Sequence, residues 1–95
     1  MFTNAGNNLD PADGEIHIID LSTGSRDYSA GTMPGVGRSV VGQVLGSDTN
    51  GITFPAGAPW RGGAGAPSYP AGTVKRFVVD NVDGTVRFTD LGEWA

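Results

Sequence analysis

The 95-residue sequence contains no cysteine, a single histidine, and only six basic residues against ten acidic ones. The missing cysteines exclude a disulfide framework, and one histidine is too few for a typical structural zinc site. The basic residues are scattered, so nothing resembles the positive stripe that a nucleic-acid backbone requires. No apolar run approaches the ~20 residues of a membrane span. We therefore expect no metal, no cofactor, no nucleic-acid partner and no membrane partner.

Helical periodicity is also missing, because glycine and proline interrupt the stretches in which apolar residues could recur at helical spacing. Alternating apolar residues instead predict strands at residues 39–45, 73–79 and 85–89, the last two as a hairpin. Gly42, inside the first of these, predicts a bulge or a close backbone approach. We expect an all-β domain of five or six short strands, arranged as a small sandwich or open barrel with long irregular Gly/Pro-rich loops.

Two similar phrases, DGEIHIIDL at residues 13–21 and DGTVRFTDL at residues 83–91, each place an Asp-Gly turn before a strand. In the first phrase, Ile16 and Ile18 would share one face of the strand, with His17 on the opposite, solvated face. The flanking sequences show no similarity. We therefore interpret the repetition as equivalent turn chemistry and not as an internal duplication.

The hydrophobic core that this composition allows is small. Hydrophobic residues make up 38% of the chain, many of them alanine, and the 16 glycines lose much backbone entropy on ordering. The stability of an isolated monomer would be ~5 kcal/mol or less. We expect one domain over residues 1–95 that is stabilised by a partner or by other copies of itself, with residues 1–12 as an extended N-terminal arm.

The segment at residues 54–72, FPAGAPWRGGAGAPSYPAG, is too rich in proline and glycine for regular structure, and we expect an extended loop. Its tryptophan, tyrosine and arginine are residue types that interfaces use as anchors. For Trp60 two interpretations remain open, an exposed anchor or a ring that folds back over the thin core. The candidate interface residues are Phe2, Trp60, Arg61, Tyr69 and Trp94.

The motifs that could carry chemistry fail on their residue types. The run GVGRSVVG resembles a phosphate-binding loop, but Gln43 stands where that loop needs lysine. The turn aspartates supply two or three oxygens, whereas a calcium loop needs five or more. His17 is too close along the chain to Ser22 and Ser25 for a strand to place them as a triad. We expect that the protein is not an enzyme.

Three classes of function remain: a structural subunit, a carbohydrate- or protein-binding module that uses Trp60, Tyr69 and Trp94, and an enzyme or regulator with an unrecognised site. A short, cysteine-free, acidic, Gly/Pro/Ala-rich β protein with phrases such as YPAGTVKRFVV (residues 69–79) resembles the decoration or cement proteins of tailed bacteriophage capsids. The resemblance implies a homotrimer, made in the host cytoplasm, that clamps neighbouring major capsid subunits on the outer surface of the virion. Tail and connector proteins are the competing interpretations. Trp60 and Tyr69 would then fill apolar pockets, and Arg61 would meet a carboxylate.

Overall fold

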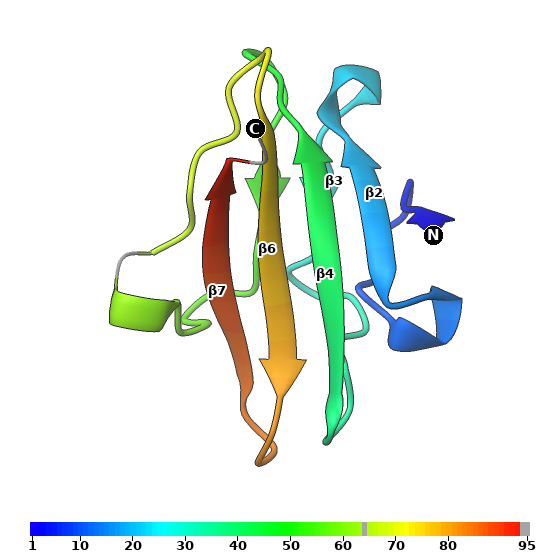
Figure 1. Cartoon of the computed structure of the whole chain (residues 1–95), viewed down its shortest axis with the longest axis vertical. Helices are drawn as coiled ribbons and strands as arrows, with labels where there is room; N and C mark the ends of the chain where they lie inside the picture. The colour runs from blue at the N-terminus through cyan, green and yellow to red at the C-terminus, as the bar shows by residue number, and fades with distance from the viewer. Residues whose placement is uncertain (64, 94–95) are drawn as a thin grey trace.

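The computed structural model describes residues 1–63 and 65–93 and consists of strands joined by turns and loops (Figure 1). Five strands form one sheet in the order β1-β2-β4-β6-β7, and two short strands form a second sheet. The predicted all-β class is therefore confirmed. The larger sheet contains β1 (Phe2–Thr3), β2 (Ile16–Asp20), β4 (Arg38–Leu45), β6 (Val74–Asn81) and β7 (Val86–Glu93). The smaller sheet contains β3 (Arg26–Asp27) and β5 (Ile52–Thr53). Three single 3-10 turns are η1 (Pro11–Asp13), η2 (Leu21–Thr23) and η3 (Arg61–Gly63).

The five-stranded sheet is mixed in direction. Strands β1, β2 and β4 run parallel to one another, whereas β4, β6 and β7 are antiparallel. The predicted hairpin is β6 and β7, and the strand predicted at residues 39–45 is β4. Strands β4 and β6 are neighbours in the sheet although the long segment with β5 and η3 separates them in the chain. That segment is therefore free to cover the sheet.

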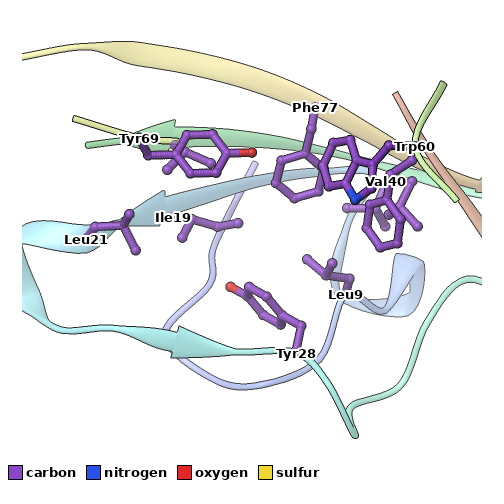
Figure 2. Packing of buried hydrophobic residues seen from close by; sticks show 11 residues of the cluster. Leu9, Ile19, Leu21, Tyr28, Val40, Trp60, Tyr69 and Phe77 are labelled. Atoms are coloured by element: carbon purple, nitrogen blue, oxygen red, sulfur yellow. The ribbon is translucent and has the colours of Figure 1, made fainter. Parts of the chain in front are cut away.

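One face of the five-stranded sheet carries the hydrophobic core, and the connections between strands cover it. In the view of Figure 1 the small sheet lies behind the large one. Alternate residues of β4 and β6 are buried on the covered face, and loop residues such as Leu9 and Tyr28 pack against them (Figure 2). The buried hydrophobic residues are Leu9, Ile19, Leu21, Tyr28, Val40, Val44, Trp60, Tyr69, Phe77, Val79 and Phe88.

His17 lies on the covered face of β2, so the solvated position predicted from the sequence is wrong. Its side chain is fully buried, whereas Ile16 is 38% exposed. The imidazole Nε2 lies 2.8 Å from the Gly14 carbonyl oxygen, and Nδ1 lies 2.9 Å from Asn4 Nδ2. Because a carbonyl only accepts, Nε2 donates to Gly14 and Nδ1 accepts from Asn4. Hydrogen bonds to both ring nitrogens make the buried position tolerable.

Residues 1–12 belong to the fold, which corrects the expectation that they form an extended N-terminal arm. Strand β1 pairs with β2, and Asn4 N donates to the Ile18 carbonyl at 2.8 Å. Leu9 is fully buried. The Tyr28 hydroxyl donates to Asn4 Oδ1 at 3.1 Å. A chain with so few large apolar residues needs its N-terminal segment to complete its own core.

The opposite face of the five-stranded sheet, which we call the outer face, is not crossed by any described segment and is turned toward the viewer in Figure 1. The strand register places Ile16, Val41 and Val78 in one row across β2, β4 and β6. Beside this row, Arg76 Nε donates to Gln43 Oε1 at 2.9 Å. By register and alternation, the outer face consists of Ile16, Ile18, Asp20, Ser39, Val41, Gln43, Leu45, Val74, Arg76, Val78, Asp80, Arg87 and Thr89.

Candidate functional site

A hollow of about 200 Å³ beside β7, the last strand of the sheet, brings together two of the candidate residues, Trp60 and Arg61. We call it the β7 hollow. Its apolar lining comes from Pro59, Trp60 and Phe88. Its charged lining comes from Arg61, Asp80 and Arg87. An apolar wall flanked by charges of both signs is suited to binding a partner side chain that has an apolar body and polar neighbours.

Trp60 is held in place by backbone pairing and by ring contacts. Phe88 N donates to the Pro59 carbonyl at 2.9 Å, and Trp60 forms a parallel β-bridge with Phe88. The Trp60 ring stacks on Phe88 with centroids 4.9 Å apart and meets Phe54 edge-to-face at 5.0 Å. Trp60 is 8% exposed, so the exposed-anchor interpretation is wrong and the core interpretation is right. A large ring stabilises a thin core more than it would stabilise an exposed loop.

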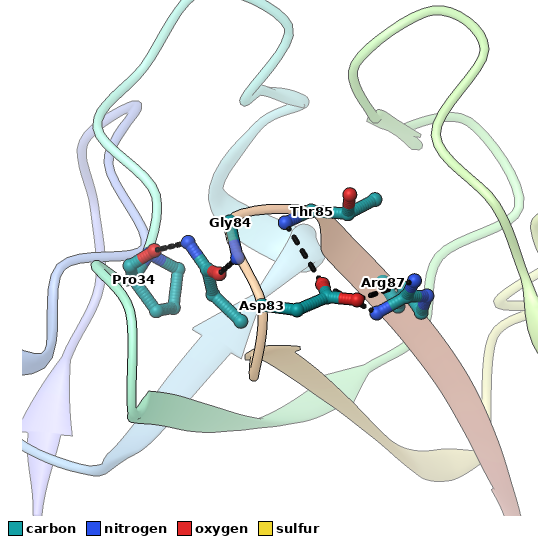
Figure 3. A network of polar contacts seen from close by, with 6 residues as sticks. Pro34, Asp83, Gly84, Thr85 and Arg87 are labelled. Atoms are coloured by element: carbon teal, nitrogen blue, oxygen red, sulfur yellow. Dashed lines mark hydrogen bonds and ion pairs between the residues drawn. The ribbon is translucent and has the colours of Figure 1, made fainter.

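An ion pair fixes the charged side of the β7 hollow. Arg87 donates to both carboxylate oxygens of Asp83, at 2.9 and 3.2 Å (Figure 3). These hydrogen bonds lower the pKa of the Asp83 carboxyl and raise the pKa of Arg87. Asp80 adds a second negative charge beside Arg87. Arg61 is exposed and makes no side-chain hydrogen bond or ion pair within the described part of the chain, so it is available to a partner.

Tyr69 lies apart from the β7 hollow and is 7% exposed, so the expectation of an exposed anchor is wrong for this residue too. Its carbonyl accepts from Ser47 N at 2.9 Å, which ties the loop to the end of β4. In Figure 2 its ring reaches into the core cluster, and its buried hydroxyl has no hydrogen-bond partner among residues 1–63 and 65–93. Burial raises the pKa of this hydroxyl, and the negative charge of Asp90 raises it further. The scarcity of large apolar residues again draws the ring inward.

Phe2 does not join this site. Phe2 is half-buried, and its ring lies edge-on to the His17 imidazole with centroids 5.0 Å apart. Trp94 lies outside the described residues. Of the five candidate interface residues, the structure thus brings Trp60 and Arg61 together and places Phe2 and Tyr69 elsewhere.

Sequence reasoning did not identify a second surface, the valine tip, which we define as Val36 and Val82 with the turns that carry them. The two side chains are 66% and 72% exposed. One precedes β4 and the other follows β6, so both lie at the same end of the sheet (Figure 1). The signal in the sequence is valine at turn positions, where Gly, Asn, Asp and Ser are the favoured residues.

The charged groups of the β7 hollow are one carboxylate and two guanidinium groups. Across the described residues, no group of three or more His, Cys, Asp or Glu side chains is placed to hold a metal ion. A search of the same residues finds no helix with the length and hydropathy of a membrane span.

Comparisons of the chain with family models, with curated proteins and with solved structures find no match. Function is therefore inferred from the surfaces of this chain, which are the outer face, the β7 hollow and the valine tip.

Proposed function

We propose that the protein is a structural virion subunit that decorates the outside of a bacteriophage capsid as a homotrimer and clamps neighbouring major capsid subunits. The observation that supports this proposal best is the outer face. A sheet with one solvated face normally alternates apolar and polar residues, with the polar ones outward. Here Ile16, Val41 and Val78 occupy outward positions in one row, and no described segment covers them. An open apolar face supports docking on another protein.

The polar pair on the outer face is compatible with such docking. Gln43 and Arg76 lie on neighbouring strands and are joined by a hydrogen bond of 2.9 Å. A pair that already satisfies part of its hydrogen-bonding capacity loses less when a partner excludes water than two separate groups would. The centre of the outer face is therefore an apolar row beside one fixed polar contact, with Asp80 and Arg87 toward the β7 edge, and these polar groups would set the orientation of a partner.

Docking through a sheet face would differ from docking through the extended segments that the sequence predicted. The sequence predicted an extended N-terminal arm and an extended loop, but residues 1–12 pair with the sheet and the rings of Trp60 and Tyr69 lie in the monomer core. A surface that is already ordered loses little conformational entropy when it docks. Several identical subunits on a regular shell then add avidity.

The carbohydrate-binding alternative has less support. Stacking of a sugar needs an accessible aromatic face, and the rings of Trp60 and Tyr69 are both buried. A protein-binding role in a tail or connector remains the competing proposal, because it would use the same outer face.

Co-sedimentation tests the proposal, with heads of the phage that encodes the protein, prepared without it. We expect the purified chain to sediment with the heads and to lower the fraction that opens on heating. Val41→Lys places a charge in the centre of the outer face and should weaken the binding about tenfold or more. Thr49→Lys is the matched control, because Thr49 is exposed on a loop away from that face.

Absence of binding to the heads would contradict the capsid role. Equal binding of the Val41→Lys and Thr49→Lys variants would show that the outer face is not the docking surface. Thermal unfolding of both variants establishes that each keeps the fold.

A further inference from the structure

The two turns of the valine tip are bonded to each other, which holds the tip rigid. Asn81, 8% exposed, donates from Nδ2 to the Pro34 carbonyl at 3.1 Å and accepts at Oδ1 from Gly84 N at 2.8 Å (Figure 3). Gly37 N donates to the Asn81 carbonyl at 2.7 Å. A single buried asparagine thus connects the turn before β4 to the turn after β6.

Rigidity and exposure together make the tip suitable as an anchor. Val36 and Val82 are 66% and 72% exposed, so their methyl groups contribute little to the core. The backbone around them is ordered before any contact forms, so docking would lose little conformational entropy. Burial of both side chains would remove apolar surface from water, which is favourable.

The same chain also has an apolar depression, the β7 hollow. Its volume of about 200 Å³ leaves space for several water molecules. Water in this space would lie against the apolar lining of Pro59, Trp60 and Phe88. Apolar groups that displace poorly ordered water from such a wall gain affinity.

We propose that the valine tip of one copy fills the β7 hollow of a second copy. The tip and the hollow are different surfaces of one chain, so the contact is heterologous and each copy carries one of each. Heterologous contacts close into a ring when the rotation between copies permits it. The inference deepens the proposed function and rests on it for the expectation of a homotrimer, for which it names the contacting surfaces.

One pair of charges beside the two surfaces is opposite in sign. Arg38 adjoins the tip and is exposed, while Asp80 lines the hollow. Asp83 also lies in the tip, but its carboxylate is already paired with Arg87 of its own chain. Within the described residues, neither Arg38 nor Arg61 makes a side-chain hydrogen bond or ion pair, so both are available to a second copy. Complementary charges of this kind set the register of an interface and suppress wrong pairings.

Light scattering of the purified chain over a concentration series tests the contact. We expect a trimer for the wild type, and a dissociation constant raised about tenfold or more by the double variant Val36→Ser/Val82→Ser. Leu91→Ser is the matched control, because Leu91 is 54% exposed and lies outside both surfaces. This control should assemble as the wild type does.

A charge exchange tests the register. Arg38→Glu and Asp80→Lys should each weaken assembly, and the combined variant should restore it, because the two side chains would again have opposite signs across the contact. Circular dichroism verifies the fold of each variant. If Arg38 and Asp80 act only within their own monomer, the combined variant should not recover wild-type assembly.

A wild-type chain that stays monomeric throughout the series overturns the inference, as does an oligomer whose dissociation constant is unchanged in Val36→Ser/Val82→Ser. Binding to heads separates this inference from the proposed function. A chain that decorates heads while its assembly is independent of the tip overturns the inference alone. A tip-dependent trimer that binds no heads supports the inference and contradicts the capsid role.

Discussion

The ring of Phe77 on β6 lies over Gly42, its partner on β4. A Cβ atom on residue 42 would lie 2.3 Å from Phe77 Cε1. The sequence predicted a bulge or a close backbone approach at Gly42, but the β4–β6 pairing continues there without a register shift, and the close neighbour is an aromatic side chain. Phe77 is fully buried and meets Phe54 edge-to-face with centroids 5.3 Å apart, so the ring has little room to move aside.

Gly42→Ala is expected to lower the free energy of unfolding by about 1–3 kcal/mol, because the added methyl group overpacks the core against the Phe77 ring. Urea denaturation measures the change. Gly35→Ala is the control, since a Cβ at residue 35 has no atom within 4 Å. Equal stabilities of the two alanine variants would contradict the proposed contact.

The two buried tyrosine hydroxyls should respond in opposite directions when they are removed. Tyr69→Phe deletes a hydroxyl without a partner in the described structure and should leave stability unchanged or raise it by about 1 kcal/mol. Tyr28→Phe deletes the hydrogen bond to Asn4 Oδ1 and should lower stability by about 1–2 kcal/mol. Chemical denaturation of both variants measures the two changes in the free energy of unfolding. Destabilisation by Tyr69→Phe would mean that its hydroxyl has a partner after all.

Asn4 is the hub of the buried polar contacts below β1. Its amide meets His17 Nδ1, the Asn8 carbonyl and the Tyr28 hydroxyl. Asn4→Ala should lower the free energy of unfolding by about 2–4 kcal/mol, because it leaves several buried polar groups without partners. Asn7→Ala, at an exposed position, should change it by less than about 0.5 kcal/mol. Similar melting temperatures for the two variants would refute the role of Asn4.

Acid should remove a stabilising contribution from Asp83. Its pKa is lowered in the folded chain by the hydrogen bonds from Arg87. Such a carboxylate stabilises the fold above its unfolded pKa of about 3.9, and the contribution is lost as the pH falls through the lower folded value. Asp83→Asn should therefore lose less thermal stability than the wild type on acidification below about pH 4. Parallel pH profiles of melting temperature would argue against this linkage.

Local patterns in the sequence predicted much of the sheet. Strand β4 and the β6–β7 hairpin follow from alternating apolar residues, and the turn before β7 follows from its Asp-Gly pair. Strand β2 shows where this reasoning fails. Both faces of this strand carry apolar residues, so their alternation does not indicate whether His17 faces the core or the solvent. Its orientation is decided by Asn4 and Gly14, which satisfy the imidazole. Local strand propensity does not predict a hydrogen-bond partner that is distant in the sequence.

The candidate site was predicted in part. The composition of the loop identified Trp60 and Arg61 as candidate interface residues. It did not show that the tryptophan ring would be buried against Phe88. The valine tip depends on Asn81, which joins two turns that are far apart in the sequence. Parallel pairing of β1, β2 and β4 likewise depends on contacts that no local pattern encodes.

The hydrogen bond from Phe88 N to the Pro59 carbonyl has a consequence for solution behaviour. Exposed strand edges template the addition of further strands and lead to aggregation. The segment that covers β7 at Phe88 contains a proline, which has no N–H to offer outward, so strand pairing stops there. Concentrated protein should therefore resist fibre formation through this part of the β7 edge, and an assembly that forms there would use side chains rather than a shared backbone ladder.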